Sequence, residues 1–474
     1  MDIIHLPIEL WTLIVEPLDI KLQVRLIQLC KTIKNKIFIT DLCNIDNNLK
    51  DKLNGDIIKK YPNIKKLYAG NNCKIGDDDL IGLNLGELNA GFNPKIKKIK
   101  HMTNLRILKA GGNCGIRDDD LVGLNLIELD ASYKSKIKKI KHMTNLRILD
   151  ACWNSEIGDD DLVGLNLIEL DVSNNLKIKK INHMTNLRIL HANDYSGIDN
   201  DSLVGLNLVE LYAYNNSKIK KINHMTNLRI LHAEWNCVIG DDDLVGLNLV
   251  ELYADDNSKI KKINHMTNLR ILNASENCGI GDDDLVSTFG GLNLIELYAG
   301  HNPKIKNIKH MTNLRILYAM GECGIEDDSL IGLNLGELNA YDNSKIKKIN
   351  HMTNLKKLYA SYNCGIGDEN LIGLNLVELN AAHNPKIKKI NHMTNLRKLN
   401  ARDICGIEDE DLVGLNLFEL NAGFNPKIKK INHMTNLKEL NAYGNCGIGD
   451  DDLIGLNLLK LDAYDNPKIK KSIV

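Results

Sequence analysis

Leucine, isoleucine and alanine return at fixed distances along most of the chain, with polar residues between them. The marker His-Met-Thr-Asn-Leu first occurs at His101 and returns every 41 residues as far as His433, apart from one step of 45 residues. With a head copy that starts at Asn63, the chain holds ten copies. Such self-similarity is typical of solenoids, in which each repeat packs only on its neighbours.

Each copy consists of two half-repeats of the same design. The first reads Leu-x-x-Leu-x-Ala-x-x-Asn-x-x-Ile from Leu105, and the second repeats the pattern from Leu126, 21 residues later. We number the positions of each half-repeat from this first residue. Because side chains alternate along a strand, the pattern predicts a short strand that buries its leucines and alanine. The asparagine at position nine (Asn72, Asn113 or Asn277) is expected to hydrogen-bond neighbouring turns.

The half-repeats resemble the leucine-rich repeat, and Cys114, beside Asn113, is similar to the cysteine of its cysteine-containing subclass. The resemblance implies an α/β solenoid of about twenty units over residues 63–474, with a parallel β-sheet on its concave face. Aspartates 118–120 precede Leu121, where carboxylates favour the start of a short convex helix. Lysines of adjacent units are expected to cancel their charge. The four residues 287–290, which cause the longer step, are expected to lengthen one such helix without moving the next strand.

Residues 1–62 lack the repeat. Apolar residues at helical spacing predict short helices within residues 1–40, and residues 41–62 are polar and are read as a junction, with a short helix near Asp56. Residues 6 to about 38 resemble an F-box, because Leu-Pro-x-Glu-Leu begins at Leu6 and a Cys-Lys pair occurs at Cys30, although Ile33 stands where the family commonly has tryptophan. The resemblance implies an all-α domain that binds the adaptor of a cullin-RING ubiquitin ligase through Leu6, Pro7, Leu10, Leu13, Ile14, Leu26 and Cys30. The alternative is a helical cap that covers the first repeat.

The charge and hydropathy of the chain argue against several classes of function. Lysine and arginine total 60 against 61 acidic residues, a net charge of −1, so we expect no nucleic-acid partner. The chain shows no signal peptide and no uninterrupted apolar stretch long enough to span a membrane, so we expect a cytoplasmic protein, with the nucleus as a further possibility. Near-identical repeats rich in Ile, Lys and Asn resemble recently expanded families of AT-rich genomes, such as those of large DNA viruses of protists. In that case the location is the host cytoplasm.

The cysteines and histidines repeat too far apart to share chemistry. Eight of the eleven cysteines occupy position ten of first half-repeats, so the closest lie two strands, or ~9.6 Å, apart, beyond the reach of a disulfide. They are expected to be free, packed thiols. The same spacing separates the histidines of the marker, which excludes a shared zinc ion and indicates structural turn residues. We find no catalytic motif and expect no enzyme activity, metal or cofactor.

The variable positions five, seven and eight are expected to face the concave surface or its rim. They hold 16 of the 22 aromatic residues, and aromatic residues are common anchors of protein interfaces. The residues predicted to bind a protein substrate are Trp153, His191, Tyr212, Tyr214, His232, Trp235, Tyr253, Tyr298, Tyr318 and Tyr359. The alternative is that the tyrosines only stack along the sheet. Glutamates at position three of second halves and Arg or Lys at position two of first halves are expected to form ion pairs between strands.

Taken with the F-box resemblance, the pattern implies the substrate-recognition subunit of a cullin-RING E3 ubiquitin ligase. Residues 1–40 would hold the adaptor, and the concave face would hold the protein to be ubiquitylated. The alternative function is a stand-alone leucine-rich-repeat scaffold or inhibitor, in which the N-terminal helices only cap the solenoid.

Overall fold

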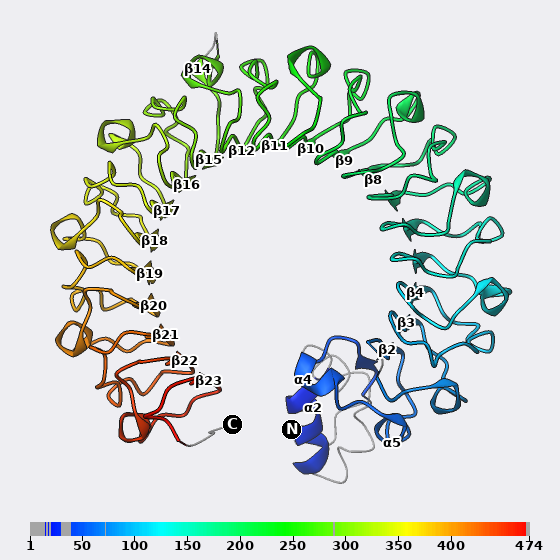
Figure 1. Ribbon diagram of the computed structural model, residues 1–474, viewed down its shortest axis with the longest axis horizontal. Coiled ribbons are helices and arrows are strands. Elements are labelled where there is room, and N and C mark those ends of the chain that lie inside the picture. Colours follow the sequence, from blue (N-terminus) through cyan, green and yellow to red (C-terminus); the bar gives the residue numbers. More distant parts are fainter. Residues whose placement is uncertain are drawn as a thin grey trace, which may run out of the picture. The chain divides into compact units, whose positions relative to one another are not determined.

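The computed structural model describes residues 15, 18, 20–29, 39–71, 73–287 and 290–470. It divides into two compact units: unit 1 ends at Leu228 and unit 2 begins at Arg229. Within each unit the strands form one layer, and the short 3-10 helices lie on the opposite side of the coil (Figure 1). No helix in the described part of the chain is both long and apolar enough to cross a membrane.

Unit 1 begins with helices and then adds one strand from each half-repeat. Its first elements are α2 (Ile20–Leu29), β1 (Asp41–Leu42), α4 (Asn47–Lys50) and α5 (Gly55–Ile58). The half-repeats supply β2 (Lys66–Tyr68), β3 (Glu87–Asn89), β4 (Ile107–Lys109), β5 (Glu128–Asp130), β6 (Ile148–Asp150), β7 (Glu169–Asp171), β8 (Ile189–His191) and β9 (Glu210–Tyr212). From β1 to β9 each strand pairs with the next in parallel.

Unit 2 continues the same design. Its half-repeats supply β10 (Ile230–His232), β11 (Glu251–Tyr253), β12 (Ile271–Asn273), β15 (Glu296–Tyr298), β16 (Ile316–Tyr318), β17 (Glu337–Asn339), β18 (Lys357–Tyr359), β19 (Glu378–Asn380), β20 (Lys398–Asn400), β21 (Glu419–Asn421), β22 (Glu439–Asn441) and β23 (Lys460–Asp462). These strands are also paired in parallel and in chain order. The predicted solenoid of about twenty parallel strands is confirmed.

The core consists of the side chains that the repeat holds constant. Leu105, Leu108 and Ala110 have no exposed surface, and their equivalents along both units are buried as well. The described position-ten cysteines are free thiols, as expected, and all except Cys73 are buried. Histidines of the marker are structural, as predicted: the Nε2 atom of His101 donates a hydrogen bond to the carbonyl oxygen of Leu80, 3.2 Å away, and most other copies repeat this bond.

The aspartate runs form 3-10 helices rather than α-helices. Their bounds are η2 (Asp77–Asp79), η3 (Asp118–Leu121), η4 (Asp159–Asp161), η5 (Asp201–Leu203), η6 (Asp241–Asp243), η7 (Asp282–Asp284), η8 (Asp327–Leu330), η9 (Asp368–Asn370), η10 (Asp409–Leu412) and η11 (Asp450–Leu453). In η3, Asp120 accepts a hydrogen bond from the backbone N–H of Arg117. Asp118 accepts bonds from the backbone N–H groups of Lys138 and Lys139, at 2.6 and 3.0 Å, so it binds the next half-repeat through its backbone rather than through the lysine ammonium groups.

The described asparagines at position nine are exposed in first half-repeats and buried in second half-repeats. Asn113 and Asn277, in first half-repeats, are exposed, which contradicts the expected bonding role, and Asn72 lies outside the described residues. The buried asparagines belong to second half-repeats. Asn93, for example, donates from Nδ2 to the carbonyl oxygens of Ala69 and Ile75 in the preceding half-repeat. In first halves the position-ten cysteine occupies the interior, so the asparagine before it points outward.

Two short strands lie on either side of residues 288–289 at the insertion, where the sequence predicted a longer helix. β13 (Val286–Ser287) pairs with β14 (Gly290–Gly291) in an antiparallel two-stranded sheet. The next strand keeps its register, since Leu272 of β12 pairs with Leu297 of β15, as expected. In the described part of the chain, the Nε2 atom of His310 is buried without a hydrogen-bond partner, so this copy lacks the bond to the carbonyl of the leucine.

Residues 39–61 cover the open end of the first repeat. β1 extends the sheet beyond β2, and the backbone carbonyl of Thr40 accepts bonds from the N–H groups of Lys65 and Lys66. Ile39, Leu42, Leu53 and Ile58 are buried. The segment read from sequence as a polar junction therefore packs as part of the solenoid.

Candidate functional site

The strand face carries two rows of side chains. Positions three and five are half-buried in most strands, whereas the leucine between them is fully buried. Position three is a glutamate in second halves and an isoleucine or lysine in first halves, except that the last copy has Glu439 in its first half and Lys460 in its second. Position five is variable. The face is therefore strongly acidic wherever isoleucine, rather than lysine, separates the glutamates.

Ion pairs between strands form from lysines at position three, whereas the sequence led us to expect them from position two. Arginines at position two, such as Arg106, donate to the backbone carbonyls of Thr103 and Leu105 instead. Pairs between strands come from lysines at position three: Lys398 Nζ lies 2.9 Å from Glu419 Oε2. Equivalent pairs are Lys66–Glu87, Lys357–Glu337 and Lys460–Glu439. Position three lies directly beside the glutamate in the sheet register, whereas position two is one residue out of line.

The tyrosines at position five are bound into the sheet. The hydroxyl group of Tyr298 donates to Glu296, and that of Tyr318 donates to Glu337. Tyr212, Tyr253 and Tyr359 make the same kind of bond. Partial burial, together with Glu296, raises the pKa of Tyr298 to about 12. The hydroxyl group of Tyr298 therefore stays protonated and donates to a carboxylate of the same face.

The rings at position five also stack on one another. His191 lies parallel to Tyr212 in unit 1, with ring centroids 4.1 Å apart, and His232 lies parallel to Tyr253 in unit 2 at the same distance. Tyr298 and Tyr318 are 4.7 Å apart. The stacking alternative therefore describes the two His–Tyr pairs, whereas the rings of Tyr298 and Tyr318 are tilted by 39° to each other.

Position seven lies largely beneath the surface, contrary to expectation. Cys152, Ser132, Ser173 and Ser361 are buried there, and Tyr214 is half-buried. The residue at this position follows the buried alanine, and the chain turns inward before it leaves the sheet.

Position eight has an unusual backbone conformation. Its φ angle is positive in every half-repeat, and the position is occupied mostly by glycine, asparagine and aspartate, which tolerate this left-handed region. Eight half-repeats nevertheless place a ring there: Phe92, Tyr133, Trp153, Trp235, His301, Tyr362, His383 and Phe424. Trp153 has a φ of 53° and is 45% exposed, and Trp235 has a φ of 58° and is 50% exposed. A large side chain is thus held in a costly conformation and shown to solvent.

Three of these rings gather in unit 1. Tyr133 and Trp153 are stacked with centroids 5.7 Å apart, and Phe92 lies 5.8 Å from Tyr133. Between Phe92 and Tyr133 the chain has Gly112, where a Cβ atom would lie only 2.4 Å from the Phe92 ring. The rings line a hollow of about 410 Å³ together with Gly112, Asn113, Lys134 and Asn154. The sequence prediction named Trp153 but missed Phe92 and Tyr133, although all three share position eight.

Acidic residues meet on the same strands of unit 1. Asp130, Asp150 and Asp171 occupy position five of three successive strands, and ligand atoms of Asp150, Cys152 and Asp171 lie within 4.8 Å of one another. Burial raises the pKa of Asp150 to about 6. The aspartates also accept backbone N–H bonds from Ser132, Cys152 and Ser173. We did not predict this cluster from the sequence, because its members lie about 20 residues apart in the chain and meet only through the pairing of successive strands.

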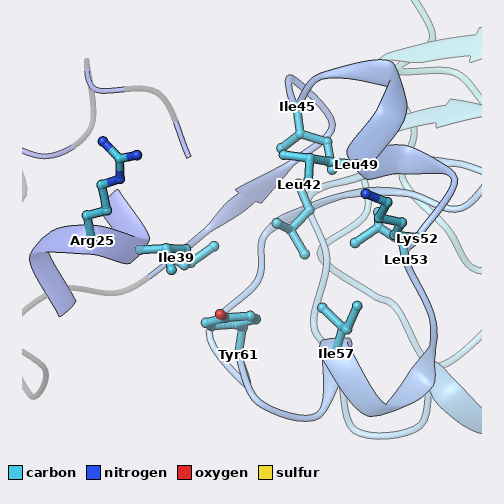
Figure 2. Close-up of a pocket in the computed structure, with 10 residues that line it drawn as sticks. Arg25, Ile39, Leu42, Ile45, Leu49, Lys52, Leu53, Ile57 and Tyr61 are labelled. Atoms are coloured by element: carbon cyan, nitrogen blue, oxygen red, sulfur yellow. The ribbon is translucent and has the colours of Figure 1, made fainter. Parts of the chain in front are cut away.

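The predicted adaptor-binding residues lie mostly outside the described residues. This applies to Leu6, Pro7, Leu10, Leu13, Ile14 and Cys30, whereas Leu26 lies in α2 and is half-buried. Near α2 there is an apolar hollow of about 440 Å³. Figure 2 shows Arg25 and Ile39 on one side of it and Leu49 and Leu53 on the other, with Ile57 and Tyr61 below.

Comparison with known proteins identifies the fold. No protein-family model and no curated sequence matches the chain. Among solved structures, TLR13 in its complex with ssRNA13 is 18% identical, with a TM-score of 0.53, covering 85% of this chain and 73% of that one. An internalin, InlF of Listeria monocytogenes, is 19% identical over 73% of this chain and 88% of its own, with a TM-score of 0.29. A leucine-rich-repeat protein of Leptospira interrogans is 16% identical over 89% and 94%, with a TM-score of 0.29. The likeness to TLR13 supports the solenoid fold alone.

Proposed function

We propose that this chain is a protein-binding scaffold that holds its partner against the strand face and the adjacent row of position eight. One observation carries the proposal: bulky rings occupy a left-handed position that most other half-repeats give to Gly, Asn or Asp. Each such residue costs on the order of 1 kcal/mol in the free chain, and strain of this kind gathers at binding sites. Exposed aromatic rings are frequent anchors of protein interfaces.

A protein fits this face better than a nucleic acid. The TLR13 structure contains single-stranded RNA, but the strand face of this chain carries a glutamate in nearly every second half-repeat and further aspartates in unit 1. Carboxylates repel phosphate groups, whereas nucleic-acid-binding surfaces are basic. The acidic, aromatic face instead favours a protein with a basic surface.

The test is site-specific photo-crosslinking in extract of the cells that produce the chain. A benzophenone amino acid replaces Trp153 or Trp235 in the full chain. The matched control carries it at Val245, which is 62% exposed and follows η6 on the opposite side of the coil. We expect a protein to crosslink from each tryptophan site and not from Val245. Equal crosslinking from Val245, or none from the tryptophan sites, would contradict the proposal.

The finer proposal is that residues 1–40 bind the adaptor of a cullin-RING ligase and that the partner on the strand face is a ubiquitylation substrate. The F-box resemblance of the sequence supports it. The packing of residues 39–61 supports it too, because β1 and the buried Ile39 and Leu42 already cover the first repeat. Covering the first repeat then does not require the segment that resembles an F-box. The alternative remains a stand-alone scaffold or inhibitor.

Purified adaptor distinguishes these two functions. The full chain, residues 39–474 and a Leu6→Ala/Pro7→Ala variant are each immobilised, and circular dichroism confirms that all three are folded. A ligase subunit retains the adaptor only through the unaltered full chain. If none of the three retains it, the scaffold function applies without the ligase.

A further inference from the structure

Unit 2 contains two buried carboxylate oxygens without a hydrogen-bond donor in the described part of the chain. One is Oε2 of Glu234, a residue with only 9% of its surface exposed, and the other is Oδ1 of Asp255. The second oxygen of Glu234 accepts a bond from Nδ1 of His232, 2.9 Å away. A buried acceptor without a donor is costly, and such groups are rare away from functional sites.

The two carboxylates lie side by side. Glu234 and Asp255 both occupy position seven, in half-repeats whose strands β10 and β11 pair directly. The backbone N–H of Trp235 donates to the carbonyl oxygen of Asp255 at 2.8 Å, so Trp235, which is 50% exposed, is joined to Asp255 through the backbone. Asp255 keeps part of its surface exposed, so the site is reached from solvent.

The charged groups that act on Asp255 are acidic. Burial raises the pKa of Asp255 to about 6, and the charged groups that raise it further are the carboxylates of Glu276, Asp256 and Glu234. Among the described residues, the one group of three candidate ligands within 4.8 Å belongs to unit 1, so this site does not have the compact donor set of a metal ion. An organic cation with several N–H donors suits two carboxylates on neighbouring half-repeats.

The geometry points to a binding site for an arginine side chain of the partner protein, formed by Glu234, Asp255 and Trp235. This inference rests on the proposed scaffold function and adds the chemistry of its partner. A guanidinium group has five N–H donors in a planar fork, so it reaches two carboxylates and lies flat on an indole ring. The ammonium group of lysine is a compact point charge and uses the tryptophan less well.

The test uses small probes on the full chain. The three tryptophans are replaced by 5-fluorotryptophan, and their fluorine resonances are assigned with Trp→Phe variants. The probes are N-acetyl-Gly-Arg-Gly-amide, its lysine analogue and its citrulline analogue, which has the shape of arginine without the charge. We expect a saturable shift of the Trp235 resonance with the arginine peptide, binding about tenfold weaker for the citrulline peptide, and little change at Trp153.

Isosteric variants test the carboxylates. Glu234→Gln and Asp255→Asn should each weaken binding of the arginine peptide about tenfold or more, since each removes a charged acceptor. Glu419→Gln is the matched control, because it removes one charge from the strand face of unit 2 at a glutamate already paired with Lys398. An unmoved Trp235 resonance, or equal shifts with the arginine and citrulline peptides, would overturn the arginine site. So would equal or tighter binding of the lysine peptide.

The two proposals fail separately. If a partner crosslinks from position eight but the arginine peptide does not bind, the scaffold function stands and the arginine site is wrong. If the peptide binds but no protein crosslinks, the scaffold function is wrong and the assignment to a protein side chain falls with it.

Discussion

Asn257 holds two turns of unit 2 together by donating its side-chain amide to the carbonyl oxygen of Ala233, 2.6 Å away in the preceding half-repeat. The same nitrogen lies 3.2 Å from the carbonyl oxygen of Ile239, and the side-chain oxygen accepts from the N–H of Lys259. Asn277, at the same position of the next half-repeat, is exposed, and its side-chain nitrogen donates to the carboxylate of Asp256. Because Asn257 and Asn277 are the same residue type at the same position, comparing them shows what burial of the side chain contributes to stability.

Replacing Asn257 with alanine should open the solenoid locally. The carbonyl groups of Ala233 and Ile239 would lose their donor while still buried, at a cost of about 3 kcal/mol in local opening free energy. Hydrogen exchange measured by mass spectrometry over residues 230–260 checks this, because long repeat proteins do not unfold in two states. Asn277→Ala is the control, with an expected cost under about 0.5 kcal/mol for an exposed side chain. Equal effects would show that the buried bonds are not what holds these turns.

At Trp235 glycine should be more stable than alanine. Both substitutions remove the ring, but the φ of 58° strains alanine and not glycine. We expect the local free energy of unfolding to be about 1 kcal/mol higher for Trp235→Gly than for Trp235→Ala. Urea unfolding followed by the loss of exchange protection around β10 compares them. A more stable alanine variant would mean that the turn relaxes to a negative φ, and the strain argument for the whole row would fail.

Asp255 should destabilise the free chain at neutral pH. Its pKa is about 6 in the folded chain and 3.8 for the free group, so the folded state binds the proton more tightly. Its stabilising contribution is therefore complete below about pH 4 and is lost as the pH rises through 6. Asp255→Asn should raise the melting temperature at pH 7 and above, and the difference from the unaltered chain should shrink towards pH 4. A difference that is constant with pH would exclude the carboxylate as its cause.

The buried thiols should resist alkylation in the folded chain. Burial raises the pKa of Cys278 to about 12 and those of Cys364 and Cys405 to about 11, so little thiolate exists at mildly alkaline pH. Iodoacetamide labelling with peptide-level mass spectrometry should modify these residues slowly before denaturation and completely after it. Cys73, which is less buried, should react first among the position-ten cysteines. Rapid labelling of Cys278 would indicate frequent opening of the core.

The periodic pattern of the sequence was sufficient to predict the strands, the three buried residues of each half-repeat and the free thiols. Leu105, Leu108 and Ala110 recur in the same local surroundings in each copy, and hydrophobic burial responds to that local periodicity. The row of left-handed residues was also within reach of the sequence, because position eight is rich in Gly, Asn and Asp. Trp153 was predicted as a binding residue because it is aromatic. From the sequence we did not infer that position eight has a strained, left-handed backbone.

Only the tertiary structure decided which equivalent residues do different work. Asn257 is buried and Asn277 is exposed because each half-repeat has one interior place after its strand, and Cys278 takes that place in the first half. Lysines at position three, rather than arginines at position two, meet the glutamates because the register aligns position three across strands. Likewise Glu234 and Asp255 become neighbours through the pairing of β10 and β11, although 21 residues separate them in the chain. A repeat determines which environments exist, whereas packing between successive coils determines which side chain occupies each one.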